Sequence, residues 1–310
     1  MADKRRTVWI TGASSGLGRY TAQALGEAGF CVIAGARSFT GDKAADGIFR
    51  LPLDVTREES VEAFQKAALA ISERVDAVVH CAGVLVLGPC EKVPVEEYRR
   101  VLETNYLGVV RMNQAVLPLM REQGGGKIII FSSINGLLGT PFQSAYTASK
   151  HALEGYAECL AMETKSMGIQ VCLVEPGDHR GGSQAYRTHI PVEQGSPYAA
   201  PMEHGIAVIN RDEAGGSDPA RLGRRVARLL LRRKMPLRVC IASADQHLAV
   251  WMHRLPVPAW KYCGSIIWER LPMLPTAVKQ KTDIMAEMMT IHEKLFVFST
   301  NPMYNKNVRL

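Results

Sequence analysis

The sequence lacks the features that mark membrane-spanning, disulfide-stapled and zinc-binding proteins. No apolar run approaches the roughly 18 to 20 residues that cross a bilayer, because Arg, Glu or Pro interrupts each candidate. The 7 cysteines are an odd number without a CxxC pair, which favours a reducing compartment and thiols used as small core residues. The basic start, residues 1–6, leads straight into a strand-like run, so we expect no secretory signal and a cytoplasmic location. No metal-ligand spacing is present, so we expect no metal.

The net charge of +7 is concentrated in one part of the sequence. Residues 221–310 hold 16 Lys and Arg against 5 Asp and Glu, whereas residues 1–220 hold 21 against 25. There is no Cys/His finger, and the basic residues do not alternate with aromatic ones as a stacking platform requires, so we expect no nucleic-acid partner. We interpret the basic helix at 221–234 as a solvated face, with peripheral membrane contact as the alternative.

Strand-like and helix-like patterns alternate through most of the sequence. Apolar runs predict strands at 7–11, 30–36, 48–53, 75–81, 127–131, 169–174 and 237–242. Helical spacing predicts helices at 16–28, 57–73, 95–120, 144–165 and from 219 onward. Continuous apolar strands separated by helices are typical of a parallel sheet covered on both faces. The expected fold class is therefore α/β, with a doubly wound parallel sheet.

A glycine-rich turn follows the first predicted strand. It runs Thr11-Gly12-Ala13-Ser14-Ser15-Gly16-Leu17-Gly18 and leads into the first predicted helix. Glycine permits the tight turn and lets the backbone approach a pyrophosphate, while the helix start offers unpaired N–H groups and a positive dipole end. We expect a dinucleotide there, with a plain connecting turn as the alternative. The expected contacts are Gly12, Ser14, Ser15, Gly16, Leu17 and Gly18.

The end of the second predicted strand bears on which dinucleotide is bound. It reads Gly35-Ala36-Arg37-Ser38 and offers no carboxylate to bind a ribose 2′-hydroxyl or repel a 2′-phosphate. Arg37 can pair with a 2′-phosphate, and charge-assisted contacts of this kind are strong. We therefore predict NADP(H) in preference to NAD(H). The alternative is that Arg37 is only a solvated charge.

The sharpest feature is the run Tyr146-Thr147-Ala148-Ser149-Lys150. On a helix, positions i and i+4 share a face, so the Tyr146 and Lys150 side chains converge, about 100° away from the apolar stripe. Acid–base work near neutrality requires a tyrosine pKa lowered by about three from its usual value near 10, which corresponds to about 4 kcal/mol. One ammonium at about 4 Å supplies about that much at an effective dielectric near 20.

Further motifs complete a family resemblance. They are Leu53-Asp54-Val55 at a strand end, His80-Cys81-Ala82-Gly83, Asn105, Ser133 thirteen residues before Tyr146, and Pro176-Gly177. With the TGxxxGxG turn and the YxxxK pair, the sequence resembles the short-chain dehydrogenase/reductases, in their single-domain branch, over about residues 7–242. The resemblance implies a Rossmann fold and hydride transfer between a nicotinamide and a carbonyl or secondary alcohol, without a metal.

By this resemblance, four residues would be catalytic. Tyr146 would be the general acid/base, and Ser133 would hydrogen-bond the substrate carbonyl. Lys150 would lower the pKa of Tyr146 and hold the nicotinamide ribose, and Asn105 would complete a proton relay through water. Asp54 and Val55 would flank the adenine. The other implied cofactor contacts are Ala82, Gly83, Asn105, Tyr146, Lys150, Pro176 and Gly177.

Two departures from the family pattern concern the site. The family usually has Asn-Asn-Ala-Gly where this sequence has His80-Cys81-Ala82-Gly83, which puts the polar support of the sheet edge in doubt. Many members also carry a Thr for the carboxamide after Pro-Gly, whereas Asp178-His179-Arg180-Gly181-Gly182 follows here. Ser183 is the candidate substitute.

Two regions are expected along the chain. Residues 1–245 would form the Rossmann dinucleotide-binding and catalytic domain, and 246–310 a C-terminal helical extension. The segment at about 177–216 is rich in Gly, Pro, His and Ser and is too long for an ordinary connection. Because long loops without regular structure are usually lids or binding loops, we expect a substrate lid there. We interpret its His179, His189 and His204 as loop polar residues rather than metal ligands.

The substrate has to be inferred from the C-terminal third. Residues 234–270 look like the terminal region of steroid- and retinol-type members, and they hold Trp251, Trp260 and Trp268. A Met-rich apolar wall suits a bulky lipid, although the same residues can be core and dimer contacts. We expect an NADP(H)-dependent hydroxysteroid dehydrogenase that acts on a small hydrophobic carbonyl or alcohol. The alternatives are a reductase of retinal, a 3-ketoacyl or 3-ketosphingoid lipid or a polyketide, and a non-catalytic NADP(H) sensor.

Family members pair through helices. By the resemblance, we expect a homodimer or homotetramer that pairs through the helices at about 104–121 and 144–165.

Overall fold

The computed structural model describes residues 5–41, 46–181, 183, 184 and 186–253. The chain divides into two compact units, Met1–Arg254 and Leu255–Leu310, and the second lies outside the described residues. The expected C-terminal extension therefore falls almost entirely outside them, Trp260 and Trp268 included. Its boundary at 245/246 stays a prediction.

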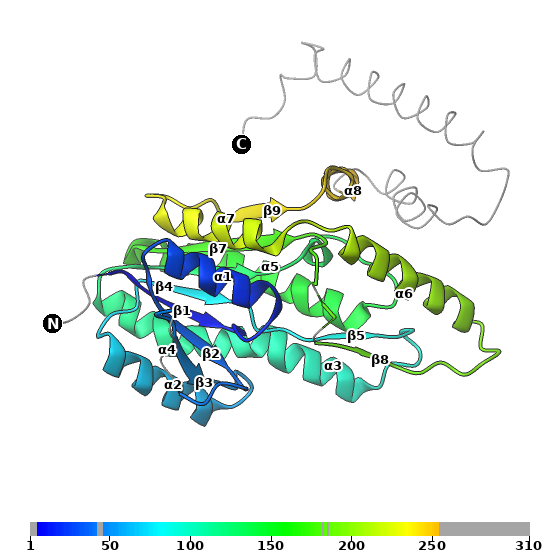
Figure 1. Cartoon of the computed structure of the whole chain (residues 1–310), viewed down its shortest axis with the longest axis horizontal. Helices are drawn as coiled ribbons and strands as arrows, with labels where there is room; N and C mark the ends of the chain where they lie inside the picture. Colours follow the sequence, from blue (N-terminus) through cyan, green and yellow to red (C-terminus); the bar gives the residue numbers. More distant parts are fainter. Residues whose placement is uncertain (1–4, 42–45, 182, 185, 254–310) are drawn as a thin grey trace, which may run out of the picture. The chain divides into compact units, whose positions relative to one another are not determined.

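A seven-stranded parallel sheet forms the centre of the first unit, as predicted (Figure 1). Its strands are β1 (Thr7–Thr11), β2 (Cys31–Ala36), β3 (Phe49–Pro52), β4 (Ala77–His80), β6 (Gly126–Phe131), β7 (Ile169–Pro176) and β9 (Arg238–Ile241). The strand order is β3-β2-β1-β4-β6-β7-β9, so the chain moves outward in one direction from β1 to β3 and in the other from β4 to β9. Ligands of such sheets bind beyond the carboxyl ends of the strands where this direction changes, here at β1 and β4.

Helices cover both faces of the sheet because the strands are apolar on both sides. Trp9, between Val8 and Ile10 in β1, packs into the core on the face of α2 (Glu58–Ile71), α4 (Gly108–Glu122) and α5 (Ser144–Thr164). Val8 and Ile10 pack on the other face with α1 (Gly16–Glu27) and α7 (Pro219–Leu231). Figure 1 shows α1 and α7 together on one side, with α2 and α4 on the other. Asp218 caps α7 through the backbone N–H of Ala220, as the Asp-Pro pair predicts.

The single long helix predicted at 95–120 is divided in the structure. It consists of α3 (Val95–Leu102), a π-helical turn at Glu103–Leu107 and α4. Asn105 lies in this turn and is fully buried. Such π turns within helices frequently occur at functional sites, and this one places the Asn105 amide against the loop after β4.

The expectation of a lid without regular structure at 177–216 is wrong. The segment contains β8 (Arg187–His189), which pairs in parallel with β5 (Leu85–Leu87), and the helix α6 (Ala199–Ala214). Figure 1 shows β5 and β8 side by side. Met202 of α6 packs against the two leucines of β5, together with Ile206 and Ile209. The other unpredicted elements are the 3₁₀ turns at Ile134–Gly136 and Lys165–Met167. The helix α8 (Ala244–His253) overlaps the start of the helical extension expected at 246–310.

Candidate active site

One cavity of about 400 Å³ lies at the carboxyl ends of the central strands. It is lined by the glycine-rich turn, by the segments after β2, β3, β4, β6 and β7, and by residues of α5 and α6. The position is where the direction of the strand order changes, so the topology and the cavity indicate the same site.

The glycine-rich turn fits a dinucleotide. Gly12 has φ +68°, and a Cβ on it would lie 2.6 Å from the backbone of Ala82. A Cβ on Gly18 would lie 2.2 Å from the carbonyl oxygen of Gly12, so both positions require glycine. Ser15, the N-cap of α1, makes no side-chain cap hydrogen bond, which leaves the first amides of the helix available to a phosphate.

Most of the cofactor contacts expected from the sequence line this one cavity. Those that do are Gly12, Ser14, Ser15, Leu17, Gly18, Arg37, Asp54, Val55, Ala82, Gly83, Tyr146, Lys150, Pro176 and Gly177. Gly16 and Asn105 do not line it. Gly16 opens α1, and the Asn105 carboxamide lies behind Gly83 and Val84.

Arg37 and Asp54 stand at the end of the cavity where the adenine ribose is expected. The Arg37 side chain is exposed and lines the cavity beside Ser38. Burial raises the pKa of Asp54, but hydrogen bonds from the Thr56 hydroxyl and amide and the charge of Arg37 together hold it below its usual value. The Asp54 carboxylate is thus hydrogen-bonded by Thr56, and the exposed Arg37 side chain lines the same cavity.

Asn105 organises the loop after β4. Its Nδ2 donates to the carbonyl of Val84 at 3.0 Å and to the Ser149 hydroxyl at 3.0 Å, while its Oδ1 accepts from the Val84 amide at 2.8 Å. Ser149 in turn donates to the carbonyl of Tyr146 at 2.7 Å. The side chain therefore ties the loop to α5, and its part in a proton relay stays a prediction.

The predicted Ser133, Tyr146 and Lys150 set converges in the cavity. Ser133 caps the short 3₁₀ turn after β6 and lines the cavity together with Tyr146. The Lys150 Nζ lies 5.3 Å from the Tyr146 ring centroid and donates to the carbonyl oxygen of Phe131 at 2.7 Å. The i and i+4 positions on α5 thus face the same opening, as their spacing predicts.

The ionisation of this set differs from the expectation. Burial raises the pKa of Tyr146 to about 12, because the opposing hydrogen bond from Ser133 is outweighed by burial and by the charges of Glu213 and Asp178. Burial also lowers the pKa of Lys150 to about 8. The expected lowering of the tyrosine pKa by Lys150 is therefore not seen, since desolvation acts on both groups and favours their neutral forms.

Thr11 and His80 support the loop after β4, a role that the sequence alone did not indicate. The Thr11 hydroxyl accepts hydrogen bonds from the amides of Cys81 and Ala82, at 3.2 Å each. His80, in place of the family's Asn, is buried and bonds through Nε2 to Asn113 Oδ1 at 2.9 Å. Burial lowers the pKa of His80 to about 4, so the imidazole is neutral. The doubt about polar support at this edge is thereby answered.

The segment at 177–216 supplies further polar groups, of which Glu213 was not expected from the sequence. Ser183 donates through its amide, at 3.1 Å, and through its hydroxyl to Glu213 Oε1 of α6. Both residues line the cavity, as do Asp178 and His179. Burial and the charges of Asp212 and Glu213 raise the pKa of Asp178 to about 6. These contacts join residues far apart in sequence, and only the fold brings them together.

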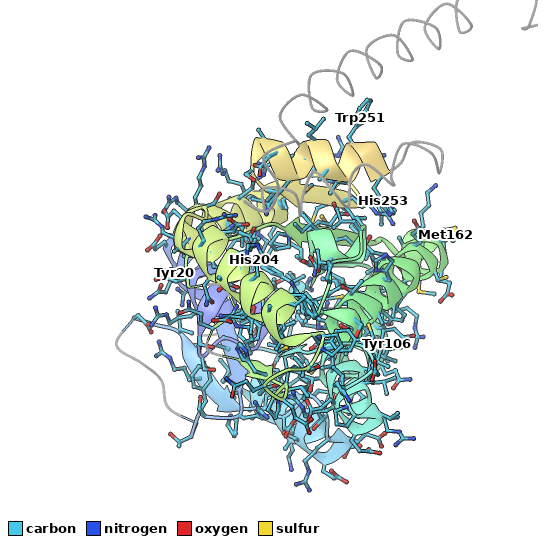
Figure 2. The ribbon with its side chains drawn as sticks, turned by 90° about the vertical axis from the view of Figure 1, so that its right-hand side faces the viewer. Tyr20, Tyr106, Met162, His204, Trp251 and His253 are labelled. Atoms are coloured by element: carbon cyan, nitrogen blue, oxygen red, sulfur yellow. The ribbon has the colours of Figure 1, made fainter. Side chains whose placement is uncertain are left out.

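The expected apolar wall is not formed by the C-terminal tryptophan that the structure describes. Trp251 is 51% exposed, does not line the cavity and points outward from α8 (Figure 2). The apolar lining comes instead from Ile134, Tyr186 and Ile209 on three separate segments. Trp260 and Trp268 lie outside the described residues.

Two searches over the described part of the chain bear on metals and membranes. No group of three or more His, Cys, Asp or Glu residues lies close enough there to hold a metal ion. None of the described helices combines the length and apolar character of a bilayer-crossing segment.

A family model described as short chain dehydrogenase matches residues 6–188. A solved short-chain dehydrogenase from Streptomyces avermitilis has a TM-score of 0.72 at 30% identity and covers 86% of this chain and 97% of its own. The seven-stranded parallel sheet with helices on both faces agrees with this structural match. The chain therefore belongs to the short chain dehydrogenase family, and it is an oxidoreductase of that family.

Two relatives and a second structure have names that specify a substrate or cofactor. The 3-ketodihydrosphingosine reductase of Bacteroides thetaiotaomicron is 37% identical over 245 residues, 78% of this chain and 89% of the relative. Retinol dehydrogenase 8 of Bos taurus is 36% identical over 189 residues, 57% of this chain and 60% of the relative. The structure of ElxO with NADP bound has a TM-score of 0.55 at 28% identity and covers 57% of this chain and 75% of its own.

Proposed function

We propose that the protein is an NADP(H)-dependent reductase that interconverts a ketone and a secondary alcohol on a long-chain lipid, with a 3-ketosphingoid base as the substrate class. The observation that carries the proposal is that Ser133, Tyr146 and Lys150 share one cavity with the glycine-rich turn. The relative named 3-ketodihydrosphingosine reductase supports the substrate class, because its similarity covers most of both chains.

The apolar end of the cavity suits a lipid ketone. Ile134, Tyr186 and Ile209 line it close to Tyr146, so a hydrocarbon tail can bind there while the carbonyl meets the tyrosine. The hydroxysteroid substrate expected from the C-terminal sequence has weaker support, because Trp251 lies outside the cavity. Steroid reduction stays a prediction, to be compared directly with the lipid.

NADP(H) is proposed as the cofactor because of the residues after β2. Arg37 lines the cavity there and can pair with a 2′-phosphate, and the strand end offers no carboxylate that would repel it. The ElxO structure with NADP bound is a related example of this cofactor in the fold. Gly12, Ser14 and Ser15 would hold the pyrophosphate, and Lys150 the nicotinamide ribose.

The proposed mechanism assigns one task to each residue. The Tyr146 hydroxyl donates its proton to the carbonyl oxygen as the ketone becomes an alcohol, and Ser133 donates a hydrogen bond to the same oxygen. The bound nicotinamide supplies the hydride that completes the reduction. A tyrosine pKa near 12 keeps the proton in place until the carbonyl oxygen gains negative charge. Lys150, charged below pH 8, stabilises the tyrosinate that results.

A substrate panel tests the proposal. NADPH oxidation would be followed with 3-ketodihydrosphingosine, a 3-ketosteroid and retinal, each with Tyr146→Phe as the blank. We expect the highest kcat/KM for the sphingoid ketone and loss of that rate in the variant. A faster reaction with the steroid would restore the hydroxysteroid prediction. NADPH binding without turnover of any ketone would favour the sensor.

Pairing of two chains through α4 and α5 is proposed as well. Met162 on α5 is 71% exposed and points outward (Figure 2), and Leu107 at the start of α4 is 37% exposed. Methionine is enriched at protein interfaces relative to the rest of the surface. Sedimentation of the full chain is expected to give a dimer or tetramer, and Met162→Glu to shift it toward the monomer. A wild-type monomer would overturn the pairing.

A further inference from the structure

Two carboxylates stand at the substrate end of the cavity. Asp178 follows Gly177 after β7, Glu213 lies near the end of α6, and both line the cavity together with Tyr146. The charges of these two residues raise the pKa of Tyr146, in addition to the larger effect of its burial. Both carboxylates therefore act on the position where the ketone oxygen is protonated.

Glu213 has an oxygen atom without a hydrogen-bond donor. The residue is only 5% exposed, and its Oε1 accepts both hydrogen bonds from Ser183. Its Oε2 makes no hydrogen bond with any described residue, although it forms a buried ion pair with Arg187 Nη1 at 3.7 Å. A buried carboxylate oxygen without a donor is unfavourable, so a ligand that brings a donor there gains from the contact.

Arg187 is the cationic side chain paired with Glu213, and its Nη1 makes no hydrogen bond with any described residue. Arg187 lies on β8 outside the cavity lining and donates through Nη2 to Asn210 Oδ1 at 2.6 Å. Lys150 donates to the carbonyl of Phe131. Asp178 accepts a hydrogen bond from Gln246 through Oδ2. Mutual repulsion with Glu213 and Asp212 accompanies burial in raising the pKa of Asp178 to about 6, so a cation between the acids would relieve the repulsion.

We propose that Asp178 and Glu213 bind an ammonium group on the carbon next to the substrate carbonyl, so that the site selects long-chain 2-amino ketones. This rests on the proposed function, because a 3-ketosphingoid base carries its ammonium on that carbon. Retinal and 3-ketosteroids have no such group. The competing interpretation is that Glu213 only holds Ser183 to α6, in which case it does not distinguish charged from uncharged ketones.

The wild-type protein provides the first test and needs no variant. With NADPH, kcat/KM would be measured for 3-ketodihydrosphingosine and for its N-acetyl derivative, which keeps the ketone and the chain but loses the positive charge. Charge-assisted hydrogen bonds contribute about 1.5 to 3 kcal/mol, so we expect the amine to be preferred by about 10- to 100-fold. Equal values for the two ketones would overturn the inference while leaving the proposed function intact.

Isosteric variants then locate the effect. Glu213→Gln and Asp178→Asn should raise KM for the amino ketone by about tenfold or more and change KM for the N-acetyl ketone less than about twofold. Glu203→Gln is the matched control, because Glu203 is exposed on the same helix and does not line the cavity. An equal rise in KM for both ketones would show that Glu213 only holds Ser183 to α6. Failure of the wild type to reduce either ketone would instead overturn the proposed function, and this inference with it.

Discussion

The ammonium group of Lys150 donates a 2.7 Å hydrogen bond to the backbone carbonyl of Phe131, the last residue of β6. This bond holds Nζ beside the ring of Tyr146, 5.3 Å from its centroid, and close to the carboxyl end of the sheet. A single lysine rotamer is thereby selected by the backbone of the neighbouring strand. We predict that the same charge holds the ribose of a bound nicotinamide.

The first prediction concerns pH. Burial lowers the pKa of Lys150 to about 8, so the side chain is charged below that pH and loses its charge above it. We expect kcat/KM for NADPH, which reports the free enzyme, to be constant below about pH 7 and to fall above about pH 8. Lys150→Arg keeps its charge at these pH values and should give a lower but flat profile from pH 7 to 9. A wild-type profile that stays flat to pH 9.5 would contradict this account of Lys150.

The second prediction concerns cofactor choice. Arg37→Gln removes the guanidinium at the cavity opening and should raise KM for NADPH by about tenfold or more, with less than about a twofold change for NADH. Initial rates with each cofactor at fixed ketone measure the effect. Arg121→Gln, an exposed position on α4 outside the cavity lining, should change neither KM. An equal loss with both cofactors would mean that Arg37 does not contact the 2′-phosphate.

The third prediction concerns stability. The pKa of His80 is lowered to about 4 in the folded chain from 6.5, so the unfolded state binds a proton first as the pH falls. The stabilisation is present above about pH 6.5 and is lost as the pH falls toward 4, by up to about 3 kcal/mol. Urea unfolding at pH 7 and pH 4.5 should show this loss, and His80→Asn should reduce it. The same loss in the variant would assign the acid sensitivity to other groups.

Most strands of the sheet could be predicted from the sequence, and so could the Tyr146 and Lys150 pair, because each depends on residues that lie close together in the sequence. Runs such as Ile128 to Ile130 specify buried strands, and the spacing of Tyr146 and Lys150 alone places them on one helix face. The helix α6 was not predicted because Pro201 and Gly205 are poor helix formers and interrupt the sequence pattern. Met202 and Ile206 nevertheless have helical spacing, and the helix is continuous in the structure.

The remaining parts of the site depend on contacts between distant residues. The Thr11 hydroxyl accepts a hydrogen bond from the amide of Cys81, and Glu213 accepts one from the amide of Ser183. No sequence window contains both members of either pair. The raised pKa of Tyr146 also depends on distant residues. It results from burial and from the charges of Glu213 and Asp178, and neither can be inferred from the spacing of residues in the sequence.

The most direct test of the central claim is a deuteride-transfer experiment with the full-length protein. NADPH carrying deuterium at both prochiral positions of the nicotinamide C4 would be incubated with 3-ketodihydrosphingosine, and the alcohol product analysed by mass spectrometry. The account predicts one deuterium on the carbinol carbon, with a rate lowered by about 10²- to 10⁴-fold in Tyr146→Phe while NADPH binding is retained. A product without deuterium, or an undiminished rate in the variant, would contradict it.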